Sequence, residues 1–190
     1  MGTFCTNITL VGVDPSVVEP LLIEAGRPAY VGGWDGHTVV FDEAGEAQDG
    51  SHASLAADLS ARLGCVAVAA LNHDDDILYL QVFEAGTVRG EYHSQPEAFA
   101  EDPDAPGGDE RWLLGLDPAA LVALVGRGDP DRVAAIAAGD AVFAGDVHHA
   151  LLTELGLPLA ACGFGYRYLS NGDAPDDAAA GALHEVGATP

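Results

Sequence analysis

An uninterrupted apolar segment at residues 65–71 constrains the fold more than any other feature of this sequence. The segment has the length of a strand, and no polar residue interrupts it. A strand with one face in water would alternate apolar and polar side chains, whereas an all-apolar strand must be covered on both faces. The segment therefore predicts the central strand of a sheet with other structure packed above and below it.

The elements before this strand are indicated by their periodicity and by their end signals. Residues 8–12 alternate like a strand, and the Asp14-Pro15 pair begins a helix. Pro20 would interrupt that helix, so either the helix starts near Glu19 or its first turn is irregular. The pattern continues with strands at residues 29–31 and 37–41, joined by an Asp35-Gly36 turn, and with a helix at residues 51–63.

Up to residue 71 the order of elements is β-α-β-β-α-β, which is the order of a ferredoxin-like sandwich. A hairpin at residues 77–83 and 87–92 would extend the sheet at its edge. We therefore predict an α+β fold with a ferredoxin-like core, a mainly antiparallel sheet and two helices on one face.

Helical signals dominate the second half of the chain. Asp-Pro pairs at 117–118 and 129–130 begin two helices, and a third spans residues 146–155. Alternation predicts a further strand at residues 159–169. We therefore divide the chain into a sheet core at residues 1–94, a C-terminal helical segment at residues 95–170 that packs on the core, and a flexible tail at residues 171–190. The helical segment contains an acidic loop at residues 101–110, before its first helix.

The charge of the chain restricts its partners. There are 30 acidic and 7 basic side chains, all of the latter arginine, and the formal net charge is −23. A basic footprint for nucleic acid is missing, and an anionic membrane surface would repel the chain. The same charge permits a basic protein partner, a cationic ligand or a metal ion. Genome composition or adaptation to high salt would also explain it.

The three cysteines, Cys5, Cys65 and Cys162, are far apart, and this spacing fits neither a disulfide framework nor a zinc site. The N-terminus lacks the positive region and apolar stretch of a signal peptide. No apolar run approaches the roughly 20 residues of a membrane span. A cytoplasmic location is therefore expected.

The densest group of potential ligands is His73, Asp74, Asp75 and Asp76, which lies between two predicted strands. A tight turn there would bring carboxylates together, and such a group would bind magnesium or calcium, or with the imidazole manganese or zinc. The calcium-loop pattern fails, because Ala85 stands where a bidentate glutamate is required. The alternative is a solvated hairpin turn, since aspartate is an ordinary turn residue.

Two further histidine motifs bear on a site. Glu91 and His93 are two residues apart on a predicted strand, so they share one face and could join the tip aspartates as metal ligands. The alternative is an ordinary strand with polar residues outward and Tyr92 inward. His148 and His149 are adjacent in a predicted helix and point about 100° apart, which does not suit a zinc pair and places one toward the core.

The sequence contains no nucleophile elbow, no phosphate-binding loop and no dinucleotide fingerprint. Four segments taken together, at residues 39–43, 71–76, 91–96 and 155–158, resemble a functionally uncharacterised family of small bacterial proteins. That resemblance implies no catalytic residue.

Two functional hypotheses remain. The first is a non-catalytic, acidic protein-interaction module of the inhibitor, immunity or regulatory type, because an acidic surface accelerates encounter with a basic partner. The second is a divalent-metal-binding protein or metal-dependent hydrolase that uses the group from His73 to Asp76.

Overall fold

The apolar segment forms strand β4 (Val66–His73) in the computed structural model, which describes residues 2–96, 111–139, 141–175 and 183–187. Val68 and Ala70 point into one apolar core, while Ala67 and Ala69 point into another on the opposite face. The prediction of a strand covered on both faces is therefore confirmed.

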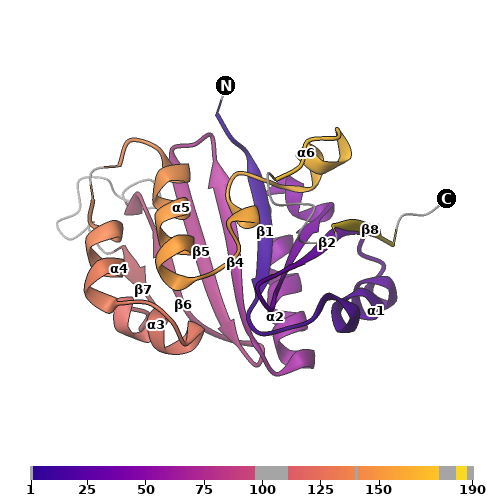
Figure 1. The fold of residues 1–190 in the computed structure, drawn as a ribbon, viewed down its shortest axis with the longest axis horizontal. Coiled ribbons are helices and arrows are strands. Elements are labelled where there is room, and N and C mark those ends of the chain that lie inside the picture. Colours follow the sequence, from indigo (N-terminus) through magenta and orange to yellow (C-terminus); the bar gives the residue numbers. More distant parts are fainter. Residues whose placement is uncertain (1, 97–110, 140, 176–182, 188–190) are drawn as a thin grey trace.

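In the described residues the strands form an eight-stranded antiparallel sheet in the order β7-β6-β5-β4-β1-β3-β2-β8. An α+β fold is thus confirmed (Figure 1). β4 lies between β1 and β5. The hairpin of β5 and β6 extends the sheet beyond β4, as expected. The other strands are β1 (Cys5–Leu10), β2 (Ala29–Trp34), β3 (His37–Asp42), β5 (Ile77–Glu84), β6 (Thr87–His93), β7 (Trp112–Leu113) and β8 (His184–Val186).

Two helices, α1 (Pro15–Ala25) and α2 (Ser51–Leu63), cover one face of the sheet. The Asp14 carboxylate caps α1 by accepting the N–H of Ser16 at 2.9 Å. The helix starts at Pro15 and contains Pro20, so it does not begin near Glu19. Pro20 is exposed, as is Ser16, whose carbonyl oxygen the missing N–H would have bonded.

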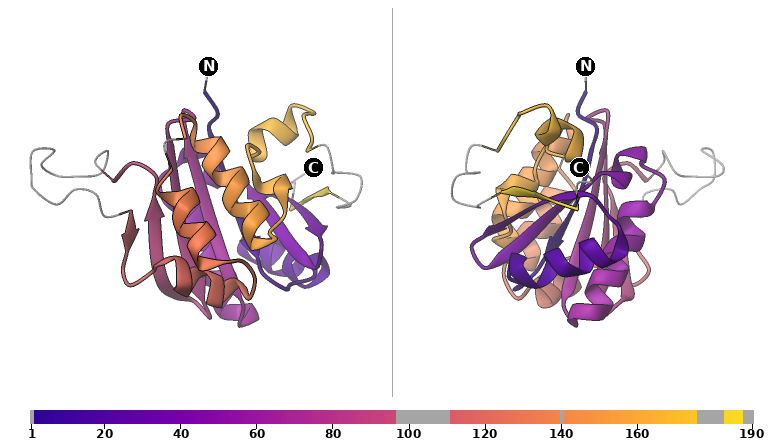
Figure 2. Two further views of the ribbon diagram at one scale, coloured as in Figure 1. Left: turned by 60° about the vertical axis from the view of Figure 1, so that its left-hand side comes forward. Right: turned by 90° about the vertical axis from the view of Figure 1, so that its right-hand side faces the viewer.

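The opposite face is covered by α3 (Pro118–Val125), α4 (Pro130–Ala137) and α5 (Ala144–Leu155), as Figures 1 and 2 show. Aspartate side chains cap the first two of these helices, in agreement with the Asp-Pro signals. Leu121, Val133 and Leu151 are buried in one apolar core with residues of β4, β5 and β6. The second half of the described chain therefore packs directly on the sheet.

The strand predicted at residues 159–169 is wrong. The segment forms a 3-10 turn, η3 (Leu159–Ala161), followed by a short helix, α6 (Tyr166–Ser170). The Asn7 side chain on β1 donates to the carbonyl oxygens of Ala161 at 2.6 Å and of Phe164 at 3.0 Å. A distant side chain therefore satisfies carbonyls that a strand would have paired in the sheet.

The C-terminal residues differ from the predicted flexible tail where they are described, because β8 pairs with Ala29, Tyr30 and Val31 at the sheet edge. Residues 176–182 and 188–190 of that tail lie outside the described residues, as does the predicted acidic loop at 101–110.

Gly90 offers a test of the packing between the sheet and the turn before α3. Its φ is +150°, and a Cβ there would lie 2.7 Å from the Leu113 carbonyl oxygen and 2.8 Å from the Leu116 nitrogen. Because both contacts are with backbone, Gly90→Ala is expected to lower the free energy of unfolding by about 1–3 kcal/mol. Urea denaturation measures this loss. Gly172→Ala is the control, since its φ is +91° with no atom within 4 Å, and equal losses would contradict the prediction.

Candidate functional site

The four residues from His73 to Asp76 form a tight turn between β4 and β5. The Asp76 N–H donates to the His73 carbonyl oxygen at 3.1 Å, and φ is +55° at Asp74 and +63° at Asp75. Positive φ at both central residues defines a type I′ turn, which matches the twist of a hairpin. The predicted hairpin turn is thus present.

The backbone of Asp75 joins this turn to two distant segments. Its N–H donates to the Thr3 carbonyl oxygen at 3.2 Å, and its carbonyl oxygen accepts the N–H of Ala144 at 2.7 Å. Helix α5 has Phe143 at its N-cap position, where no side chain caps the helix. The turn carbonyl therefore satisfies one of the N–H groups in the first turn of α5 that have no partner within the helix.

The side chains of the turn have different environments. His73 contacts Gln48 through Nδ1 and Oε1 at 2.7 Å, and its ring meets the Phe4 ring edge-on at 4.9 Å. Asp75 is half-buried and accepts a long hydrogen bond of 3.4 Å from Asn72 Nδ2. Asp74 and Asp76 are exposed. The turn therefore presents two carboxylates to solvent.

Glu91 and His93 share one face of β6, as predicted, and Tyr92 points into the core from the other. His93 Nε2 lies 3.4 Å from Glu91 Oε2, and the His93 ring contacts the Tyr79 ring across the hairpin. Burial, followed by a hydrogen bond and charge from Glu91, raises the pKa of Tyr79. Glu91 and His93 thus interact with each other and with β5.

Within residues 2–96, 111–139, 141–175 and 183–187, no three His, Cys, Asp or Glu side chains are arranged so as to hold a metal ion. The six predicted ligands, His73, Asp74, Asp75, Asp76, Glu91 and His93, are thus divided between the turn and the β5–β6 face. The divalent-metal hypothesis stays a prediction that titration calorimetry with magnesium, calcium, manganese and zinc can test.

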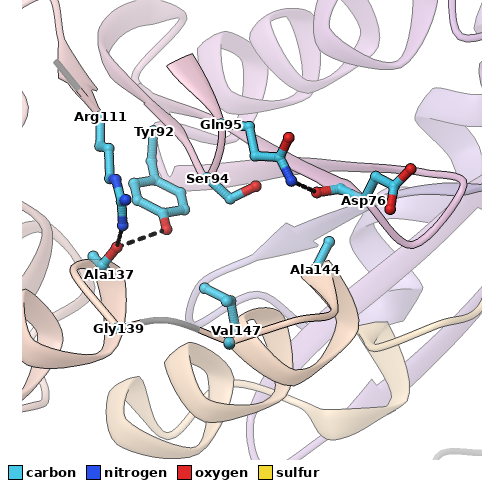
Figure 3. Close-up of a pocket in the computed structure, with 10 residues that line it drawn as sticks. Asp76, Tyr92, Ser94, Gln95, Arg111, Ala137, Gly139, Ala144 and Val147 are labelled. Atoms are coloured by element: carbon cyan, nitrogen blue, oxygen red, sulfur yellow. Dashed lines mark hydrogen bonds between the residues drawn. The ribbon is translucent and has the colours of Figure 1, made fainter. Parts of the chain in front are cut away.

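A cavity of about 280 Å³ lies beside the turn (Figure 3). Asp76, Ser94 and Gln95 line one side, and Ala144 and Val147 of α5 line another. Gln95 Nε2 donates to the Asp76 carbonyl oxygen at 2.9 Å, and Ser94 Oγ accepts the N–H of Leu78 at 2.8 Å. These bonds hold the cavity wall against the acidic turn.

The opposite wall of the cavity is built around the C-terminal end of α4. Tyr92 Oη donates to the Ala137 carbonyl oxygen at 3.4 Å, and Arg111 Nη1 donates to the same atom (Figure 3). Burial raises the pKa of Tyr92 to about 12, although the charge of Arg111 opposes this shift. The phenol therefore remains a protonated donor at neutral pH.

Three large apolar side chains are exposed at or next to the segments that the Asp75 backbone joins. Val142 is 77% exposed, Phe143 52% and Phe4 39%. Phe143 precedes Ala144, and Phe4 follows Thr3, so these residues flank the turn. We call the surface made by these apolar residues with three exposed carboxylates the acidic–apolar face; it comprises Phe4, Asp74, Asp76, Val142, Phe143 and Asp146.

Most arginines of the chain form ion pairs with acidic residues outside this face, so their charge is neutralised locally. The pairs are Arg27–Asp42, Arg62–Glu24, Arg89–Glu84, Arg132–Glu154 and Arg167–Glu46. Within the part of the chain that the structure describes, Asp74, Asp76 and Asp146 are not among the partners in these five ion pairs.

The sequence pointed to the acidic turn but not to its apolar neighbours. Phe4, Val142 and Phe143 showed no periodic pattern, and the backbone hydrogen bonds of Asp75 to Thr3 and Ala144 bring their segments to the turn. The available signal was the apolar pair Val142-Phe143 directly before a helix, where a polar capping residue is usual.

The remaining candidate residues have structural positions. His148 is buried and His149 is exposed, as their angular separation predicts. The three cysteines are free thiols, and burial raises the pKa of Cys5 to about 12. Among the described residues, the helices are too short or too polar to cross a bilayer.

Comparison with the models of known protein families, with curated proteins and with solved structures finds no match for this chain. This result agrees with the resemblance to a family without assigned activity. Function must therefore be argued from the geometry of the site.

Proposed function

We propose that this chain is a non-catalytic interaction module that binds a basic polypeptide through the acidic–apolar face. The observation that carries the proposal is the position of Val142 and Phe143, which are highly exposed and directly precede Ala144, whose N–H donates to the Asp75 carbonyl oxygen of the acidic turn. Apolar residues scattered singly on a surface need no explanation, but grouped ones with a polar rim are typical of interaction sites.

The apolar part of the face would supply the binding energy. An exposed phenylalanine loses water when a partner covers it, and a few such side chains usually dominate the energy of an interface. Phe143 also occupies an N-cap position that a polar residue would fill more favourably. An exposed residue that is unfavourable for the local structure is expected at functional sites, so Phe143 at this position supports a role in binding.

The charged part of the face would supply speed and selectivity. Asp74, Asp76 and Asp146 repel acidic partners and attract basic ones, and the net charge of −23 extends this attraction beyond contact distance. The adjacent cavity of about 280 Å³ offers room for one side chain of the partner. An inhibitor, immunity or regulatory protein has these requirements and needs no catalytic group.

We also infer that the first six elements form a ferredoxin-like sandwich. The order β4-β1-β3-β2 with antiparallel neighbours, and α1 and α2 together on one face, support this assignment.

A phage-displayed library of random peptides, selected on the immobilised chain, tests the proposed interaction. We expect enrichment of peptides that combine arginine or lysine with an aromatic or large aliphatic residue. The triple variant Asp74→Asn, Asp76→Asn, Phe143→Ser should bind the selected peptides about 30-fold more weakly, because it removes about 2 kcal/mol of interface energy. Fluorescence anisotropy with labelled peptides measures the affinities.

The matched control also removes two exposed aspartates and one exposed apolar side chain, but elsewhere: Asp131→Asn, Asp173→Asn, Ile23→Ser. It should retain most of the affinity of the parent chain. Equal weakening in both variants would mean that net charge alone drives binding. No enrichment, or peptides that bind both variants as well as the parent, would overturn the proposal.

A further inference from the structure

A second cavity, of about 610 Å³, lies at the opposite end of the sheet from the acidic turn. β1 starts at Cys5, which pairs with Asn72 beside the turn, and the cavity begins after the other end of β1, at Gly12. Its walls are the loop at residues 12–16, the β2–β3 turn and His184 of β8. The acidic–apolar face contributes no residue to it.

The walls of this cavity are held together by hydrogen bonds and close packing. The Gly12 N–H donates to His37 Nδ1 at 3.2 Å, and Thr38 Oγ1 donates to the Val13 carbonyl oxygen at 2.7 Å. At Gly33 a Cβ would lie 2.8 Å from Cγ of Pro15, so glycine permits the close approach of the loop to β2. The cavity is therefore preformed, which reduces the entropy cost of binding a ligand.

His37 presents a defined donor at this cavity. Because its Nδ1 accepts a backbone N–H, the proton of the neutral ring resides on Nε2. Burial lowers the pKa of His37, and this effect is opposed by the charge of Asp35 and assisted by that of Arg127. The ring is thus neutral at physiological pH and adds a polar N–H without positive charge.

The other lining residues combine negative charge with an apolar wall. The carboxylates of Asp14, Glu19 and Asp35 line the cavity, and its described lining contains no arginine. Asp14 accepts hydrogen bonds from Ser16, and Glu19 lies 3.0 Å from His184 Nε2. Apolar lining comes mainly from the half-buried Pro15, because Val13 and Trp34, which also line the cavity, are only 8% and 5% exposed.

The placement of the carboxylates distinguishes among cations. A metal ion needs several ligands that converge on one point, but no such group of His, Cys, Asp or Glu is present in the described part of the chain. The carboxylates instead come from the loop, from α1 and from the β2–β3 turn. Separated negative charges around a partly apolar wall suit a ligand whose positive charges are separated by apolar carbon atoms.

We propose that this cavity binds an aliphatic diamine or polyamine, with its ammonium groups at Asp14, Glu19 and Asp35 and its methylene chain mainly against Pro15, next to the small exposed parts of Val13 and Trp34. The volume lies within the range of small-molecule sites, which is about 300–1,000 Å³. This site is independent of the proposed protein interaction.

Putrescine and spermidine are suitable probes for calorimetric titration of the intact chain. We expect saturable binding of one ligand per chain, with spermidine tighter than putrescine because it carries more charge. Trp34 should report binding by a change in fluorescence that Trp34→Phe abolishes, since the other tryptophan, Trp112, lies in β7. Sodium chloride at matched ionic strength should produce no saturable change.

The variant Asp14→Asn, Asp35→Asn is expected to bind spermidine at least about 10-fold more weakly, because two carboxylates are lost from the cavity. Asparagine suits both positions, since it caps helices as well as aspartate and accepts the positive φ of +50° at residue 35. The control variant Asp131→Asn, Asp173→Asn removes the same charge elsewhere and should retain binding, as should Asp74→Asn, Asp76→Asn, Phe143→Ser. Absence of saturable heat, or equal affinity of the cavity variant and the parent chain, would overturn the proposal.

Discussion

Replacing Arg27 with alanine is expected to lower the free energy of unfolding by about 3 kcal/mol, at the lower end of the range for breaking a buried ion pair. Asp42 is only 1% exposed, and both of its carboxylate oxygens accept hydrogen bonds from Arg27, with Nε to Oδ1 at 2.9 Å. The N–H of Gly45 remains as a donor to Oδ2 at 2.8 Å. Without Arg27 the interior would contain a carboxylate with a single donor.

Chemical denaturation of three variants would isolate this effect. Arg62→Ala breaks an exposed pair with Glu24 and should cost less than about 1 kcal/mol. The double variant Arg27→Ala, Asp42→Asn should be more stable than Arg27→Ala alone, because the amide carries no charge to bury. If Arg27→Ala is no more destabilising than Arg62→Ala, water screens the pair and the interpretation is wrong.

The parts of the fold that were predictable from the sequence are those set by local signals. The apolar segment that forms most of β4, the Asp-Pro helix starts and the hairpin turns depend on residues close together in the chain. The strand predicted at residues 159–169 failed because its partner is distant: the Asn7 amide satisfies two of its carbonyl groups. Strand β8 was not predicted for a similar reason. Its three residues are too few to show a periodic pattern, and they form a strand by pairing with the distant β2.

The candidate site was predictable only in part, for the same physical reason. Four consecutive ligand-type residues are visible in any sequence, so the turn from His73 to Asp76 could be placed between two strands. Its neighbours are fixed by backbone hydrogen bonds of Asp75 to Thr3 and Ala144, which have no sequence signature. The position of the exposed Phe143 near the turn could therefore not be predicted from the sequence.

Stability is expected to fall by about 3 kcal/mol as the pH decreases from about 6.5 toward 4, because of His148 alone. Burial, with a smaller contribution from the neighbouring His149, lowers the pKa of His148 to about 4. The unfolded chain then takes up a proton near pH 6.5, while the folded chain resists protonation until the pH is much lower. The stability from the neutral ring is complete above pH 6.5 and is lost as the pH falls. His52 contributes in the same direction, since burial lowers its pKa as well.

Urea denaturation of the parent chain and of His148→Leu, at several pH values between 7.5 and 4.5, separates this contribution from the titration of the carboxylates. His148 Nδ1 has no hydrogen-bond partner among the described residues, so leucine should be accommodated without leaving a buried donor unpaired. The difference in unfolding free energy between the two proteins should shift in favour of His148→Leu as the pH decreases. The exposed His149→Leu variant should follow the parent chain. If His148→Leu shows the same pH dependence as the parent chain, the imidazole is protonated in the folded state near its ordinary pKa, and the core around α5 must admit water to solvate it.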